Sequence, residues 1–169
     1  MKPQDILIIL KIHTWKGERW SISSLAGSVG MSGSETHGAI KRCELSGIYN
    51  PITRKPVLAA LEEFIIHGLK YAFPAEPGPP DRGMPTAHSA PPLSEHIAGT
   101  EEIYVWPYSK GSARGISVTP LYPSVPFACE GDTELYGYLA LIDAIRIGRA
   151  RERKLAEEII VKNLRGPSK

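Results

Sequence analysis

Residues 21–48 read SISSLAGSVGMSGSETHGAIKRCELSGI and carry the clearest structural pattern in the chain. Serines stand where two helices would begin and glycines where they would end, and these residue types favour helix caps and helix stops. The pattern predicts one helix from Ser21 or Ser23 to Gly30 and another from Ser32 or Ser34 to about Ser46. Two short helices joined by a tight glycine turn are therefore expected in the N-terminal part.

Amphipathic helices are predicted on both sides of this pair. Upstream, Pro3 opens a segment whose apolar residues recur at helical spacing and which ends near Gly17. Downstream, Asn50-Pro51 marks a turn, and Pro56 opens a helix with apolar residues on one face, at positions 57, 61, 64, 65 and 69. The first 70 residues are thus expected to be mainly helical.

The stretch 21–48 resembles the helix-turn-helix of winged-helix DNA-binding proteins of the MarR-like type. The resemblance rests on Leu25-Ala26 in the first helix, on Gly30 four residues after the alanine, on the Ser-x-Ser start of the second helix, and on the closing Gly-Ile. In that motif the small Ala26 lets two helices cross closely, and Gly30 makes the sharp turn between them. The resemblance implies a winged helix-turn-helix-like DNA-binding unit in residues 1–70 and says nothing about residues 71–169.

The resemblance also implies that residues 32–45 form the recognition helix, which would lie in the DNA major groove with its first residues nearest the base edges. The side chains expected to contact DNA are Ser32, Ser34, Glu35, Thr36, His37, Lys41, Arg42, Arg54 and Lys55. Residues 1–55 hold eight Lys and Arg against four Asp and Glu, a local charge of +4. Positive charge therefore gathers where the motif would need it to bind phosphates.

Two features depart from the family pattern. Thr36 occupies a position that the family usually fills with an aliphatic residue. The segment 49–54 is short and the helix at Pro56 follows at once, so no two-stranded wing is predicted after Ile48.

The middle of the chain is crowded with proline and glycine, which make up nine of the 19 residues from 74 to 92. Because each proline removes an amide donor and fixes its own backbone angle, a loop or polyproline-like strap is predicted over residues 71–100. Residues 103–108 and 115–122 then alternate in strand fashion and predict a β-hairpin. A long helix is expected from Glu134 onward, which Gly148 either breaks or weakens. The fold class is therefore α+β.

Other clusters allow two interpretations each. Arg146, Arg149 and Arg153 recur at helical steps, either as a basic stripe for phosphates or as a solvated face neutralised by Glu157 and Glu158. Aromatic residues near the strap either line a ligand pocket or pack the strap against the domain as part of its core. They are Tyr71, Phe73, Tyr104, Trp106, Tyr108 and Tyr122.

Histidines and nucleophiles show no motif for metal binding or catalysis. His67, His88, His96 and Cys129 lack a metal-ligand spacing. No local nucleophile motif surrounds Ser89, although His88 and Asp81 stand nearby in the sequence. We therefore predict no metal, no cofactor and no enzymatic activity.

The composition is that of an ordinary folded chain. Its 169 residues are 42% hydrophobic and 22% charged, which argues against a disordered or fibrous protein. The net charge of +2 is weak evidence for any partner. The longest apolar run, residues 6–10, is far shorter than the roughly 20 residues of a membrane span. Two widely separated cysteines predict buried or idle thiols, and a cytoplasmic location without membrane contact is expected.

Together these observations predict a transcriptional regulator that binds double-stranded DNA. Operators of such proteins are usually paired half-sites, so a homodimer is expected, with residues 135–145 or 57–69 supplying its apolar interface. The alternative is a protein-interaction or antitoxin-like module that uses the helix-turn-helix as a scaffold and binds a protein partner through its C-terminal part. An enzyme would require the acidic and histidine side chains of the strap to meet in one cleft.

Overall fold

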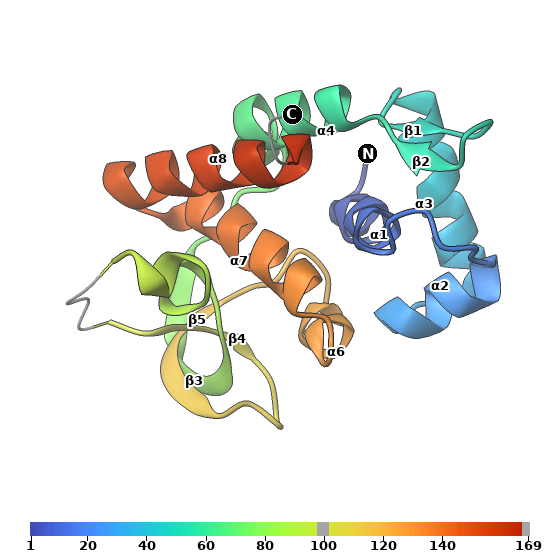
Figure 1. Ribbon diagram of the computed structural model, residues 1–169. Coiled ribbons are helices and arrows are strands. Elements are labelled where there is room, and N and C mark those ends of the chain that lie inside the picture. Colours follow the sequence, from blue (N-terminus) through green and yellow to red (C-terminus); the bar gives the residue numbers. More distant parts are fainter. Residues whose placement is uncertain (98–101, 167–169) are drawn as a thin grey trace.

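The first helix, α1 (Pro3–Thr14), is buried on nearly every side and forms the centre of the N-terminal half. Its side chains from Ile6 to Leu10 are fully buried, as expected for a helix that is hydrophobic all round. The computed structural model describes residues 1–97 and 102–166. In Figure 1, α1 lies between the N-terminal helices on one side and the long helix α7 on the other.

The two short helices begin and end where the sequence predicts. α2 (Ile22–Val29) starts at Ser21, whose hydroxyl accepts a hydrogen bond from the Ser24 amide. It ends at Gly30, which adopts a left-handed conformation with φ of 66° that glycine takes at little cost. α3 (Gly33–Leu45) starts at Ser32, whose hydroxyl accepts from the Glu35 amide. Both α2 and α3 pack on α1.

A small hairpin follows α3, where the sequence predicts no pair of strands. β1 (Tyr49–Asn50) and β2 (Lys55–Pro56) pair antiparallel. The side-chain oxygen of Asn50 accepts hydrogen bonds from the amides of Ile52 and Thr53. Because this side chain closes the turn, two residues per strand suffice, and the prediction of no strand pair is wrong. The helices α4 (Leu58–His67) and α5 (Leu69–Ala72) come next.

The proline-rich segment contains a strand rather than only a loop. β3 (Pro77–Pro85) pairs antiparallel with β4 (Tyr104–Pro107) and with β5 (Ala113–Val118). Proline fixes φ near −65° and lacks an amide, but its carbonyl still accepts hydrogen bonds. The expectation of a strap without strands over residues 71–100 is therefore wrong for residues 77–85.

The predicted hairpin of β4 with β5 is also wrong. Each of these strands runs antiparallel to β3, so they run parallel to each other, and the three strands close into a small barrel (Figure 1). Glycine permits the close approach, because a Cβ added to Gly83 would lie 1.8 Å from the carbonyl oxygen of Trp106. The short 3-10 helices η1 (Ala87–Ser89) and η2 (Leu93–Glu95) lie between β3 and β4.

The expected long C-terminal helix is divided in two. After α6 (Val125–Cys129), α7 (Thr133–Ile147) and α8 (Ala150–Arg165) pack against each other. Between them Gly148 is extended, and a Cβ there would lie 2.3 Å from the carbonyl oxygen of Ala144. The glycine therefore breaks the helix. The mixed α+β class predicted from the sequence is confirmed.

α7 connects both halves of the molecule. Its residues from Leu135 to Ile145, apart from Tyr136 and Gly137, are buried within the chain. The apolar face of α4 and α5 is likewise buried at Leu61, Ile65 and Leu69. The two faces expected to supply a dimer interface are thus used inside the protein.

A buried polar network holds α7 to the barrel. The Asp143 carboxylate accepts hydrogen bonds from Thr86 Oγ1 at 2.8 Å and from Trp106 Nε1, and it pairs with Arg146 at 2.8 Å. Arg146 also donates to the carbonyl of Phe73. Its side chain is only 4% exposed, so Arg146 belongs neither to a basic stripe nor to a solvated face.

Within the described residues, no helix has the length and apolar character needed to cross a membrane.

A second polar contact joins the N-terminal half to α7. Asp132 Oδ2 lies 2.6 Å from Lys11 Nζ on α1, and Asp132 Oδ1 caps α7 by accepting from the Leu135 amide. Burial alone would raise the pKa of Asp132, but the hydrogen bonds from Lys11, the Leu135 amide and Thr14 outweigh it, so the pKa lies below its usual value.

Replacing Asp132 by Asn should reduce the free energy of unfolding at neutral pH by about 1.5–3 kcal/mol, because a charge-assisted contact is lost. A carboxylate with a lowered pKa stabilises the fold above its unfolded pKa of about 3.9, and this contribution disappears as the pH falls through the lowered value. Urea unfolding over a pH series should therefore show the difference between Asp132→Asn and the unmodified protein shrinking in acid. Glu158→Gln, at an exposed position on α8, is the control. A pH-independent difference would contradict the assignment.

Candidate nucleic-acid interface

The outer face of α3 carries three of the predicted contact residues. Ser34, His37 and Lys41 are exposed and recur at steps of three and four along the helix, so they lie on one side. Lys41 pairs with Glu44 at 3.0 Å, but its side chain is 63% exposed and is therefore accessible to a ligand. Ser32 is exposed as well, with its hydroxyl used to cap the helix.

Thr36 is placed differently from the prediction. It is fully buried on the inner face of α3, at the position where the resemblance expects an aliphatic residue. Among the described residues, its hydroxyl has no hydrogen-bond partner. Thr36 therefore packs in the core and does not contact a ligand of the outer face.

Arg42 also proves to be a structural residue. Its Nε and Nη2 both donate to the carboxylate of Asp5 on α1, with Nη2 at 2.6 Å from Oδ1. Asp5 is completely buried. The hydrogen bond from Arg42 to Asp5 raises the pKa of the guanidinium. The DNA contact predicted for Arg42 is thus opposed by a bidentate ion pair that ties α3 to α1.

Glu35 links the start of α3 to two distant segments. Its carboxylate accepts from Gln4 Nε2 at 3.0 Å and from the Tyr122 hydroxyl at 2.8 Å. The hydrogen bond to Glu35 raises the pKa of Tyr122. Nearby, the Ser124 hydroxyl donates to the Val29 carbonyl, and Phe127 packs against Gly30. The C-terminal half therefore holds the turn between α2 and α3 in place.

The hairpin turn places the remaining predicted residues beside the loop that joins α1 to α2. The Arg54 guanidinium stacks over the Trp20 ring at 4.3 Å and donates through Nη2 to the Trp20 carbonyl. Together with Arg19 and Lys55 these residues line a small cleft of about 150 Å³. Arg54 and Lys55 are among the contacts predicted from the sequence, whereas Arg19 and Trp20 are not, because nothing in the local sequence shows that the two loops meet.

Two aliphatic side chains are exposed at the end of this surface. Leu45, the last residue of α3, is 90% exposed, and Ile52 in the hairpin turn is 91% exposed. The exposed part of α3 and the hairpin therefore combines hydroxyl, imidazole, cationic and apolar groups rather than a dense basic patch.

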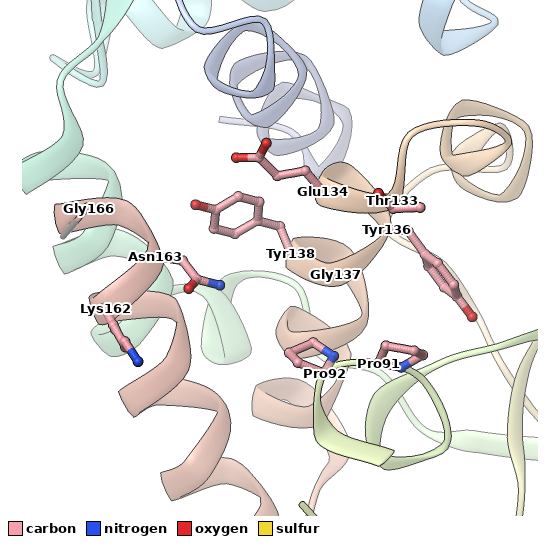
Figure 2. A pocket seen from close by; sticks show the side chains of 10 residues that line it. All are labelled: Pro91, Pro92, Thr133, Glu134, Tyr136, Gly137, Tyr138, Lys162, Asn163 and Gly166. Atoms are coloured by element: carbon pink, nitrogen blue, oxygen red, sulfur yellow. The ribbon is translucent and has the colours of Figure 1, made fainter. Parts of the chain in front are cut away.

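A larger groove lies on the other half of the molecule. It has a volume of about 720 Å³ and is lined mainly by residues of α7, α8 and the Pro91-Pro92 turn. Figure 2 shows Tyr136 and Tyr138 leaving α7 in different directions and Asn163 projecting from α8 toward α7. The Tyr136 hydroxyl donates to the Pro85 carbonyl, and the Tyr138 hydroxyl lies 3.1 Å from His13 Nε2. Both polar ends are thus used within the fold.

Two of the residues that lack a metal-binding or catalytic motif, His88 and Ser89, have structural hydrogen bonds. His88 is buried with its Nε2 hydrogen-bonded to the Glu102 carbonyl, and Ser89 accepts from the Tyr104 amide. Asp81 is exposed on β3. Cys43 and Cys129 are buried, as predicted, and burial raises the pKa of the Cys43 thiol to about 12. Among the described residues, no three His, Cys, Asp or Glu side chains lie together as a metal site.

No family model, no curated protein and no solved structure matches this chain.

Replacing Arg42 by Ala should reduce the free energy of unfolding by about 3–5 kcal/mol, because it leaves the buried Asp5 carboxylate without its partner. Arg42→Lys should recover only part of this loss, since an ammonium does not reproduce the bidentate contact. Thermal or urea unfolding measures both. The neighbouring Lys41→Ala, on the exposed face, should change stability by no more than about 0.5 kcal/mol. Equal stability of Arg42→Ala and Lys41→Ala would refute the role given to Arg42.

Proposed function

We propose that the protein is a DNA-binding transcriptional regulator of the winged-helix type, with α3 as the recognition helix in the major groove. The observation that carries the proposal is the exposed row of Ser34, His37 and Lys41 on α3, followed by the β1–β2 hairpin, with Arg54 at its turn and Lys55 at the start of β2. A helix of this length would fit the groove, and the β1–β2 hairpin, which follows α3 in the chain, would serve as the wing.

The contacts follow from what each exposed group can do. Ser34 and His37, in the first half of α3, are the candidates for base edges, because the first residues of a recognition helix lie deepest in the groove. Lys41, Arg54 and Lys55 would bind phosphates as cations. Glu35, Thr36 and Arg42 are left out of the contact set, since they hold α3 on the body of the protein.

A homodimer would match paired half-sites and double the contact surface. The faces of α7 and of α4 with α5 are buried within one chain, so a dimer must use another surface.

DNA binding is tested by fluorescence anisotropy with a duplex from the region upstream of the protein's own gene and with a scrambled duplex, each over a salt series. We expect tighter binding to the native duplex. His37→Ala should reduce the difference between the two duplexes, because a base contact is lost, by about 1–3 kcal/mol. Lys41→Ala should weaken binding to both duplexes about equally and lower the salt slope by about one.

The matched control for these variants is Lys154→Ala, an exposed lysine on α8, which should leave both affinities unchanged. If both His37→Ala and Lys41→Ala leave the affinities unchanged, the DNA contact lies elsewhere on the protein. A folded protein with no affinity for either duplex at low salt would refute the proposal.

A second candidate function is protein interaction, with the helix-turn-helix as a scaffold. It is favoured by Leu45 at the end of α3 and Ile52 in the hairpin turn, since almost fully exposed aliphatic side chains favour an apolar protein contact. If a partner binds there, the double variant Leu45→Ser and Ile52→Ser should no longer retain the stoichiometric partner in a pull-down from the native host, whereas Lys154→Ala should retain it. If both variants retain the partner, Leu45 and Ile52 do not form its binding site.

A further inference from the structure

The small cleft between the α1–α2 loop and the β1–β2 turn has the chemistry of an anion site. Its lining includes three cationic residues, Arg19, Arg54 and Lys55, and among its described lining residues Glu18 is the one acid. No salt bridge within the described residues uses any of these four side chains. The cleft therefore keeps an excess of positive charge that no protein carboxylate neutralises.

The cleft is also held in a fixed geometry. Arg54 adopts a left-handed backbone conformation with φ of 56°, which aims its side chain back over Trp20. The stacking and the hydrogen bond from Nη2 to the Trp20 carbonyl orient the guanidinium. A planar guanidinium has five N–H donors, and the bond to Trp20 occupies only one of them. The other donors remain for a ligand.

Lys55, which also lines the cleft, lies beside Gly17. A Cβ added to Gly17 would lie 3.7 Å from the Lys55 Cε and 3.8 Å from its Nζ. Gly17 also has a φ of 90°, so the chain reverses there and keeps the α1–α2 loop beside the hairpin. Arg19 follows two residues later and is exposed at the rim.

The cleft has room for a small anion. Its volume of about 150 Å³ is several times the roughly 10–15 Å³ that one water needs, which is enough for a tetrahedral phosphate group. Guanidinium groups bind phosphate oxygens through paired hydrogen bonds, and a lysine adds a point charge.

We propose that this cleft binds one backbone phosphate of double-stranded DNA, with Arg19 and Arg54 as donors and Trp20 as the residue that positions Arg54. The inference rests on the proposed function and extends it, because it adds a phosphate contact from the α1–α2 loop, outside α3. This contact carries no base information. It fixes the register of the protein on the duplex and adds one neutralised phosphate to the salt dependence of binding.

The decisive variant is Arg19→Gln, since Arg19 is exposed and belongs to the cleft alone. In anisotropy titrations against duplexes of different sequence, it should weaken binding by the same factor for each duplex and lower the slope of log affinity against log salt by about one. Arg151→Gln, which removes an exposed arginine on α8, should change neither quantity. Circular dichroism of both variants should match that of the unmodified protein.

The role of Trp20 is tested separately with Trp20→Leu, which keeps every charge. If Trp20 positions Arg54, this variant should lower affinity uniformly across sequences while the variant Trp20→Phe, which keeps an aromatic face, recovers most of it. A merely structural role would instead make both variants lose thermal stability in parallel with affinity.

Titration with inorganic phosphate, followed by the NMR signal of the Trp20 indole, distinguishes a nucleic-acid phosphate from a free one. If the unmodified protein binds duplex DNA and Arg19→Gln keeps its full salt slope, the cleft inference is overturned and the proposed function stands. If the unmodified protein binds no duplex at low salt, the proposed function is overturned. A shift of the Trp20 signal by phosphate in that case would assign the cleft to free phosphate and overturn the DNA contact.

Discussion

The arrangement of the C-terminal half depends on the contacts of the Asp143 carboxylate. It lies in the middle of α7, is 1% exposed, and receives hydrogen bonds from Thr86 after β3 and from Trp106 in β4. Arg146, one turn later, balances its charge and donates to the carbonyl of Phe73. A buried ion pair with these partners costs desolvation but fixes a unique geometry, because any displacement leaves a charge unpaired. The barrel, α7 and the segment after α5 are thereby locked together.

The same helix then determines how the N-terminal half is held. Asp132 at the start of α7 pairs with Lys11 on α1, and the segment before α7 contacts the α2–α3 turn through Ser124. Tyr122 in this segment also binds Glu35 at the start of α3. A recognition helix must keep its angle to the body of the protein if it is to fit a groove. The C-terminal half therefore supports the proposed interface without forming part of it.

Predictions from the sequence succeed where the deciding interactions are local. The serine caps of α2 and α3, the glycine turn at Gly30 and the helix break at Gly148 each depend on residues within one turn of the chain. Predictions from the sequence fail for the β3–β4–β5 barrel. The prolines of β3 suggest a loop when considered alone, and only the distant β4 and β5 supply the partners that make residues 77–85 a strand. The parallel pairing of β4 with β5 follows from β3 lying against both.

By itself, the sequence determined the α+β class and the first helices, since caps and helical periodicity are local signals. It did not separate the exposed residues of α3 from Thr36 and Arg42, which the structure places in the core and in an ion pair with Asp5. The tertiary structure decided which charged groups remain available. In the sequence, nothing distinguishes Arg42 and Arg146 from Arg19 and Arg54. In the structure, Arg42 and Arg146 pair with buried carboxylates, whereas Arg19 and Arg54 line an open cleft. The carboxylate of Asp5 is 37 positions from Arg42. Asp143 is only three positions from Arg146, but the burial of this pair, like the contact of Arg42 with Asp5, results from tertiary packing. The cations free to bind a ligand are therefore known only once the chain has folded.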